Sequence, residues 1–226
     1  MGNGASDSGQ AFPVYITVIA ALLFLAFVYF AVGQAASTRN GAQTAADSAA
    51  LAAAQDAREQ LRIGWLEVIA DPTQWGPFLD GEQYVDALAC GRAAEFAARN
   101  GAELPPGGCE RLLSGGEGFK VTVRTTGTVG RSLVPGTESQ HAAASAEAVI
   151  EPRCTFDEPE PTAEPAPPEP TDEPPPTEPT QEPTPTDPPE KEPIVGLVCG
   201  DEAWDIDPEN PALPDAVDLF SVRLSD

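Results

Sequence analysis

The sequence predicts an α+β protein in which one long N-terminal α-helix crosses a membrane and continues into a small domain with a short antiparallel sheet. Three observations predict this fold class. Residues 11–32 form an uncharged, mostly apolar run, small helix-favouring residues follow it, and apolar and polar residues alternate near residue 120. A Pro/Glu-rich insertion at residues 155–193 is predicted to be disordered and to interrupt the domain.

The composition excludes some classes of partner. The 226 residues include 36 acidic and 12 basic side chains, so the formal net charge is −24. Nucleic-acid binding needs clustered Lys and Arg against phosphates, and we therefore expect no nucleic-acid partner. After the apolar run and the insertion are subtracted, about 100 to 150 residues remain, enough for one small core.

The apolar run has the length of a membrane span. Its 22 residues from Ala11 to Val32 would extend about 33 Å as a helix, the thickness of the hydrocarbon core of a bilayer. The alternative is a long export signal. However, residues 1–10 contain no Lys or Arg, whereas secretory signals normally begin with basic residues. We predict a short cytoplasmic leader at 1–10 and a single transmembrane helix at 11–33.

Two features of the sequence disagree about orientation. Arg39 on the C-terminal flank favours a cytoplasmic C-terminus by the positive-inside rule. One Arg is thin evidence, and four cysteines behind an export segment are typical of disulfides formed outside the cytoplasm. We therefore expect a single-pass protein of the cell membrane whose C-terminal domain, residues 34–154 and 194–226, is extracytoplasmic.

The elements of the domain follow in order. The first helix is predicted to continue to about Ala70, because Asp71-Pro72 disfavours helix. A second helix is predicted over 82–100, ended by Gly101, and residues 104–118 are predicted to be a loop. Period-two alternation predicts three strands of one small sheet, with inward side chains in each of them. These strands are 119–129 with Phe119, Val121 and Val123; 144–150 with Ala146, Ala148 and Ile150; and 217–224 with Phe220, Val222 and Leu224.

Residues 155–193 are a segment without a core. They contain 15 Pro and 12 Asp or Glu against one Lys. This composition favours an extended, self-repelling coil, which we interpret as a spacer.

The four cysteines allow three pairings, and the sequence alone does not select one. Local geometry favours Cys90 with Cys109, which would pin the predicted loop to the second helix. It also favours a bond between Cys154 and Cys199, which would close the acidic segment into a loop outside the domain. A zinc site is the rival, but no cysteine pair has metal-ligand spacing and His141 is the only histidine.

No enzymatic motif is present in the sequence. Because the chain has only one histidine, most catalytic triads and acid-base pairs are excluded. The sequence also contains no phosphate-binding loop and no nucleophile elbow. The acidic cluster from Asp201 to Glu209 resembles the start of a calcium loop, but Ala216 stands where that loop requires Glu. We interpret the cluster as a loop before the last strand, and we expect no metal, no cofactor and no enzyme activity.

A row of small residues continues beyond the apolar run at a spacing of four. Such a row lets helix backbones approach closely. For the later members, packing on the chain's own sheet is an equal alternative, whereas the earlier ones favour contact with another molecule. The row consists of Gly33, Ser37, Gly41, Ala45, Ala49 and Ala53.

The segment SGQAFPVYITVIAALLFLAFVYFAVGQAASTRNGAQTAADSAALAAAQ resembles the amino terminus of TadE/TadG-like proteins of Flp-type (tight adherence) pilus assembly. The acidic insertion and the terminal PDAVDLFSVRL are similar to actinobacterial members. The resemblance implies a minor pilin or pseudopilin-like component whose partners are other pilin or pseudopilin subunits and the Tad secretion machinery. The alternative is a single-pass anchor for adhesion or cell-wall contact.

The resemblance also implies a processing site and a departure from the major pilins. Prepilin cleavage would fall after Gly9, so that Gln10 would open the mature helix. The major pilins carry Glu at the fifth mature position and Tyr at the sixth, whereas this chain has Val14 and Tyr15. The missing Glu fits an assembly or tip component better than a filament subunit.

Overall fold

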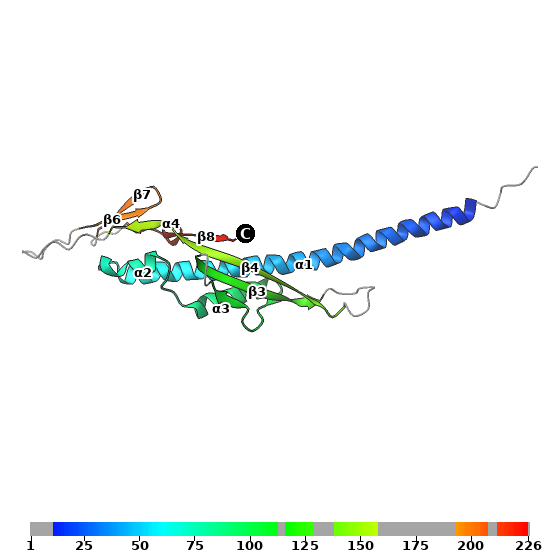
Figure 1. Ribbon diagram of the computed structural model, residues 1–226, viewed down its shortest axis with the longest axis horizontal. Helices are drawn as coiled ribbons and strands as arrows, with labels where there is room; N and C mark the ends of the chain where they lie inside the picture. Colours follow the sequence, from blue (N-terminus) through cyan, green and yellow to red (C-terminus); the bar gives the residue numbers. More distant parts are fainter. Residues whose placement is uncertain (1–10, 113–115, 129–137, 158–192, 208–211, 226) are drawn as a thin grey trace, which may run out of the picture. The chain divides into compact units, whose positions relative to one another are not determined.

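The computed structural model describes residues 11–112, 116–128, 138–157, 193–207 and 212–225. The predicted α+β class is confirmed, with a long apolar N-terminal helix followed by antiparallel strands. Helix α1 runs unbroken from Ala11 to Glu67 (Figure 1). Pro13 lies in its first turn, where the missing N–H has no intrahelical partner to lose.

Helix α1 ends three residues before the predicted position. After Glu67 the chain turns into the 3₁₀ helix η1 (Pro72–Gln74) and the short helix α2 (Gly76–Leu79). The Asp71 carboxylate accepts hydrogen bonds from the Thr73 hydroxyl at 2.6 Å and the Gln74 amide at 2.6 Å. These bonds lower the pKa of Asp71 and fix the exit from the helix.

The described residues form two compact units. The first comprises α1 up to Gln60, residues 84–151 and residues 222–225. Its sheet has the order β1-β3-β4-β8, and β2 also pairs with β3. The strands are β1 (Ala102–Glu103), β2 (Cys109–Arg111), β3 (Glu117–Thr128), β4 (His141–Pro152) and β8 (Phe220–Leu224).

Helix α3 (Asp86–Arg99) packs antiparallel along α1. The Val85 N–H donates to the Gln60 side chain at 2.9 Å, and the Asn100 amide donates to the Ser48 hydroxyl at 2.9 Å. The buried side chains of α3 are Ala89, Ala93 and Ala97, again spaced by four. Small residues on both helices allow close approach of their backbones. The structure begins α3 at Asp86, four residues after the predicted start.

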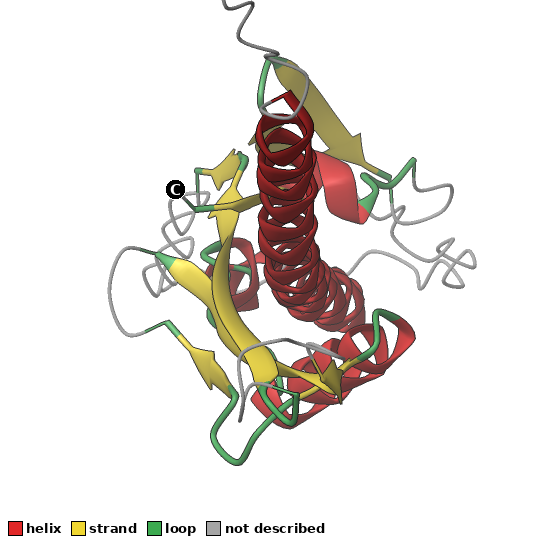
Figure 2. Cartoon of the chain, turned by 90° about the vertical axis from the view of Figure 1, so that its right-hand side faces the viewer, coloured by secondary structure: helices red, strands yellow, loops and turns green. Residues whose placement is uncertain are grey.

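The inner face of the sheet follows the predicted alternation on β3 and in part on β4, whereas the predicted inward side chains Ala146, Val222 and Leu224 are only half-buried and Val149 is buried as well. Phe119, Val121 and Val123 of β3 are fully buried, and so are Ala148 and Ile150 on β4. Figure 2, which looks along α1, shows the helix end-on beside the long strands. The alternating apolar residues were therefore a sound guide to the core of the first unit.

Two further predicted boundaries are wrong, and so is the prediction of a single sheet. Residues 109–111 of the predicted loop pair with β3 as β2. Residues 217–219, predicted as the start of the last strand, belong instead to the short helix α4 (Ala216–Leu219). Its N-cap Asp215 and Asp218 make a capping box, which competes with extended backbone. The last strand therefore begins only at Phe220.

The second unit holds a separate three-stranded sheet that the sequence reading missed. It consists of β5 (Cys154–Phe156), β6 (Ile194–Cys199) and β7 (Glu202–Ile206), in the order β5-β6-β7. Gly200 has φ of +61° at the first position of the β6–β7 turn, a conformation that suits Gly. The predicted loop after Asp201 is thus a strand. Residues 158–192 of the predicted insertion lie outside the described residues, and its first residues, Thr155 and Phe156, belong to β5.

Both disulfides join the partners that local geometry favoured. Cys90 of α3 is bonded to Cys109 of β2, and Cys154 of β5 is bonded to Cys199 directly opposite on β6. The first bond lies in the first unit and the second bond in the second unit. Each therefore crosslinks elements within one unit.

A Tyr–Arg–Glu cluster holds β2 against the start of α3. The Tyr84 hydroxyl donates to Glu117 at 3.0 Å, and Arg111 pairs with Glu117 at 2.5 Å. The Arg111 guanidinium also lies 4.2 Å from the centre of the Tyr84 ring. Burial and the neighbouring Glu117 carboxylate raise the pKa of Tyr84 well above its usual 10.

The raised pKa of Tyr84 predicts that the protein loses stability at alkaline pH. The pKa of the Tyr84 hydroxyl is higher in the folded chain than in the unfolded chain, so the neutral hydroxyl favours folding. This contribution to stability is complete below pH 10 and is lost as the pH rises above 10. We expect hydrogen-exchange protection of residues 84–128 to fall between pH 10 and 11. The fall should be smaller in Tyr84→Phe, and an equal fall in both proteins would contradict the assignment.

Candidate helix-packing surface on helix α1

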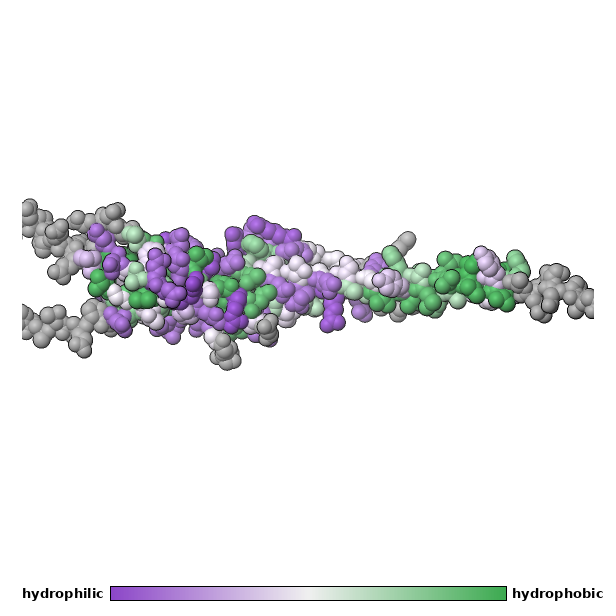
Figure 3. Space-filling model, turned by 90° about the horizontal axis from the view of Figure 1, so that it is seen from above, coloured by the Kyte–Doolittle hydropathy of each residue, from purple (hydrophilic) through white to green (hydrophobic). Residues whose placement is uncertain are grey.

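The N-terminal part of α1 exposes large apolar side chains on all sides. Phe12 is 72% exposed and Tyr29 is 83% exposed, and none of the 18 most apolar consecutive residues is buried. Figure 3 shows hydrophobic side chains gathered along this end of the helix. A helix that is apolar all round is stable only inside protein or lipid. The described residues contain one helix long and apolar enough to cross a membrane, and it is this one.

The one threonine inside the apolar run has its hydroxyl satisfied within the helix. The Thr17 hydroxyl donates to the Val14 carbonyl at 2.8 Å, so it needs no partner outside the helix. Beyond the run, the Thr38 hydroxyl donates to the Gln34 carbonyl at 3.2 Å in the same way. The helix can therefore be surrounded by lipid or by other helices without leaving these donors unpaired.

The row of small residues divides into two parts. Gly33, Ser37 and Gly41 are exposed, whereas Ala45, Ala49 and Ala53 are 0% exposed. The last three pack inside the chain's own domain, as the alternative interpretation expected. They therefore hold the domain on α1, and only the first three residues are available to another molecule.

The two exposed glycines have no internal structural reason to be Gly. Both are helical, neither has a positive φ, and a Cβ added to Gly33 or Gly41 would meet nothing within 4 Å. Gly in a helix interior costs about 1 kcal/mol relative to Ala. The fold of this chain alone does not explain that cost, whereas close approach of a second helix would.

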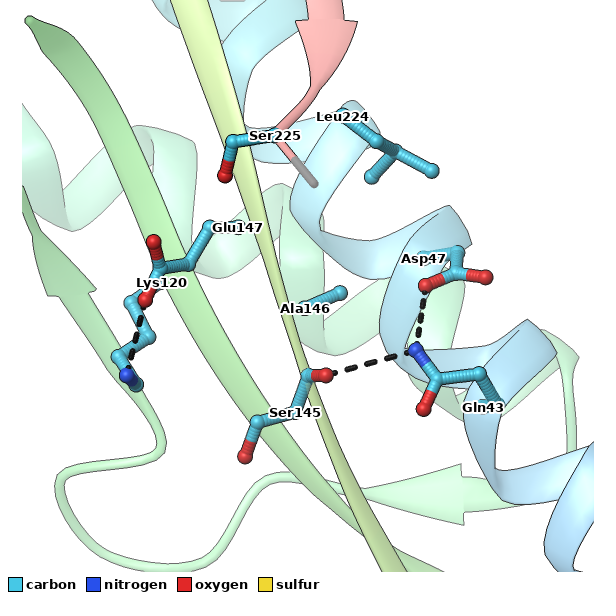
Figure 4. A pocket seen from close by; sticks show the side chains of 8 residues that line it. All are labelled: Gln43, Asp47, Lys120, Ser145, Ala146, Glu147, Leu224 and Ser225. Atoms are coloured by element: carbon cyan, nitrogen blue, oxygen red, sulfur yellow. Dashed lines mark hydrogen bonds and ion pairs between the residues drawn. The ribbon is translucent and has the colours of Figure 1, made fainter.

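A groove of about 430 Å³ opens immediately C-terminal to this row, between α1 and β4. Figure 4 shows the Gln43 amide directed at both Asp47 and the Ser145 carbonyl, with donor distances of 2.7 and 3.4 Å. On the other side Lys120 pairs with Glu147 at 2.8 Å, and this carboxylate raises the pKa of Lys120. No local pattern in the sequence predicts this groove, because the groove depends on how β4 and α1 pack.

The one histidine of the chain lies at the end of the β3–β4 ladder. The His141 ring lies 2.6 Å from the Thr125 carbonyl, where it holds the end of the β3–β4 ladder. Among the residues that the structure describes, no three His, Cys, Asp or Glu side chains are close enough together to hold a metal ion. The predicted cleavage positions Gly9 and Gln10 lie outside the described residues.

Comparison with known proteins agrees with this picture. Residues 9–56 match the model of the TadE/G-like Flp pilus-assembly family. Neither the curated proteins nor the solved structures contain a match to the chain. The matched residues comprise the apolar run, the three exposed small residues and the first buried turns of α1. Residues 9–56 thus match a TadE/G-like Flp pilus-assembly domain, and this match, together with the one candidate membrane helix among the described residues, supports involvement of the protein in Flp pilus assembly at a membrane.

Proposed function

We propose that the protein is a minor pilin or pseudopilin-like component that acts through helix packing in and just outside the membrane. The observation that carries the proposal is the division of α1. Its C-terminal part is buried in the chain's own domain, whereas the part from Phe12 to Gly41 is exposed and ends in a row of small residues. Its partners would be helices of other pilin or pseudopilin subunits and the Tad secretion machinery.

The same proposal places the C-terminal domain outside the cytoplasm and assigns it no enzymatic activity. The two disulfides support this orientation, because structural disulfides persist in oxidising compartments and are rare in the cytosol. A polybasic juxtamembrane segment would argue for the opposite orientation, but Arg39 is the only basic residue within twenty positions of Val32.

Bulky residues in the exposed row should block assembly without unfolding the protein. We expect Gly33→Leu with Gly41→Leu to reduce surface pili at least tenfold, because Leu would hold a neighbouring helix away. Each Cβ has open space, so the domain itself should remain folded. Piliation is counted by electron microscopy, and partner subunits are quantified after detergent extraction of the full chain.

Ala35→Leu is the matched control. Ala35 is exposed on the same helix but lies roughly 160° around the axis from Ser37, given 100° per residue. The Ala35→Leu substitution should therefore leave the number of surface pili unchanged. Normal piliation and normal recovery of partners in the double Gly variant would refute helix packing by this row.

The second candidate is a cell-envelope anchor for adhesion or cell-wall contact. The single membrane helix and the predicted spacer at 155–193 favour it. Deletion of the gene separates the two candidates. Loss of surface pili supports the pilin-like role, whereas normal pili with impaired adhesion support the anchor.

A further inference from the structure

We propose that the end of the β3–β4 hairpin and the first polar turns of α1 form a surface that binds phospholipid headgroups of the membrane that holds the apolar run. This headgroup surface contains Arg39 on α1 and Arg124 on β3, and its ligand is the headgroup phosphate. A second contact with the bilayer would restrict the tilt of the domain. The inference requires only that the apolar run lies in a bilayer, so it is independent of the pilin-like role.

The β3–β4 hairpin runs along α1 toward the apolar run. The Tyr84 hydroxyl donates to the first residue of β3, and the N–H of the next residue after Tyr84 donates to Gln60 of α1. In the middle of β4 the Ser145 carbonyl accepts the Gln43 amide at 3.4 Å. The hairpin therefore passes from the level of Gln60 to the level of Gln43. Figure 1 shows it continuing along α1 in that direction.

The hairpin end reaches the level at which α1 leaves the apolar run. From Ser145 back to His141, the first residue of β4, the strand extends about 13 Å. Along a helix the same distance covers about nine residues, which leads from Gln43 to about Gln34. The apolar run ends at Val32. Headgroups extend roughly 5 to 8 Å beyond the hydrocarbon core on each side, so the hairpin end lies at their level.

The two arginines of the headgroup surface lie at one level along α1. Arg39 is one turn before Gln43, about 6 Å along the axis. Arg124 lies opposite Ala143, which is about 7 Å along the strand from Ser145. Both residues are therefore nearer to the apolar run than the Gln43–Ser145 contact. Long Arg side chains can extend over the surface toward the phosphates.

Both guanidinium groups are available to an anionic ligand. Arg39 and Arg124 are exposed, and neither has an ion pair or a side-chain hydrogen bond within the part of the chain that the structure describes. Most other basic side chains there are already paired with carboxylates. The paired residues are Arg62, Arg92, Arg99, Arg111, Lys120 and Arg223. Arg39 and Arg124 can thus bind phosphate, which matches the planar guanidinium, without breaking an internal pair.

The charges of the chain are segregated around this surface. No acidic residue occurs from Gln10 to Ala46, and Glu138 is the only one from Gly118 to Ala146. The 36 acidic residues of the chain are therefore concentrated elsewhere. An anionic leaflet attracts the basic end and repels the acidic remainder. Both forces orient the domain with the hairpin end toward the headgroups.

The other exposed side chains of the hairpin end fit the headgroup layer better than the hydrocarbon core. Thr126, Thr128, Ser139 and Gln140 are exposed and uncharged. Their hydroxyl and amide groups can donate hydrogen bonds to lipid oxygens. In the described part of the hairpin no large apolar side chain is exposed. Entry into the hydrocarbon core would leave these polar groups without partners.

Lipid crosslinking of the full chain tests the contact. In nanodiscs of phosphatidylcholine with phosphatidylglycerol, a benzoyl-phenylalanine at Gln140 should give phospholipid adducts, detected by mass spectrometry. The yield should be at least fivefold higher than for the same group at Ala94. Ala94 is also exposed but lies on α3, whose end bonds to Ser48, about 24 Å beyond Val32 along the helix. Equal yields at the two positions would overturn the contact.

Removal of the two guanidinium groups tests the ligand. Arg39→Gln with Arg124→Gln should lower the adduct yield at Gln140 at least threefold, and about 0.5 M NaCl should lower it as well. Arg92→Gln with Arg99→Gln is the matched control, because it removes the same charge from the exposed face of α3. The control should keep the original yield. An unchanged yield in the first double variant would overturn the role of the two arginines.

The outcomes separate this inference from the proposed function. If the double Gly variant loses pili while Gln140 and Ala94 give equal lipid yields, helix packing stands and headgroup binding fails. If the Gln140 yield is high and the double Gly variant keeps its pili, headgroup binding stands and helix packing fails. Adducts from Gln140 that join a protein instead of a phospholipid in piliated cells would overturn the assignment of the ligand.

Discussion

Replacing Trp75 with Ala is expected to lower the free energy of unfolding of the second unit by about 3 to 5 kcal/mol. Trp75 is fully buried and packs edge-to-face on Trp65, with ring centres 5.3 Å apart. Its other neighbour is Phe156, at 4.5 Å, and its indole N–H donates to the Val68 carbonyl at 3.2 Å. Removal would open a large cavity and take away one of the two hydrogen bonds that the Val68 carbonyl accepts, the other being from the Asp71 N–H at 2.9 Å.

Hydrogen exchange measures this loss without requiring the membrane helix to unfold. Protection of amides in residues 61–83 should fall by roughly two to four orders of magnitude, because each 1.4 kcal/mol is a factor of ten. Trp204→Ala is the control, since Trp204 is only half-buried and should cost less. Equal losses in both variants would show that the Trp75 cluster is not the core of this unit.

Removing the disulfide between Cys154 and Cys199 is expected to cost about 4 kcal/mol in the chain-entropy account. The bond closes a sequence separation of 45 residues, whereas Cys90–Cys109 closes 19 and should be worth about 3 kcal/mol. The larger loop includes the Pro/acidic segment, so the unfolded chain gains more freedom when this bond is absent.

The two double Ser variants provide matched comparisons. Cys154→Ser with Cys199→Ser should expose the second unit to proteolysis and lower the cellular amount of the protein. Cys90→Ser with Cys109→Ser should affect the first unit instead, because each bond lies within one unit. Unchanged proteolysis in both variants would show that the disulfides do not stabilise the domain.

The sequence predicted elements whose signal is local. The helical apolar run and the alternation in β3 each depend on side chains within one segment, and the structure has a helix and a strand there. Strands β1, β2 and β5 contain only two or three residues, so no periodicity can reveal them. They exist because β3 and β6 offer them an edge to pair with. The β6–β7 hairpin had a readable signal in the apolar IVGLVC followed by Gly-Asp, which our interpretation did not use.

The candidate surface was predictable only in part. The six small residues form one row in the sequence, and nothing in their spacing shows that the row divides after Gly41. The row divides into an exposed part and a buried part because the domain covers α1 from Ala42 onward. Gln43 and Ser145 are 102 positions apart, so their contact requires the folded β4 beside α1. Pairings of this kind arise from tertiary packing, which a single sequence does not display.

The unbroken helix α1 has a mechanical consequence. No Pro follows Pro13 before the helix ends, so the backbone has no hinge between the lipid and the domain. About ten residues separate Val32 from Ala42, which sets a rigid stand-off of roughly 15 Å above the bilayer. A displacement of the apolar run along the helix axis would therefore be transmitted to the part of α1 that the domain covers, which begins at Ala42.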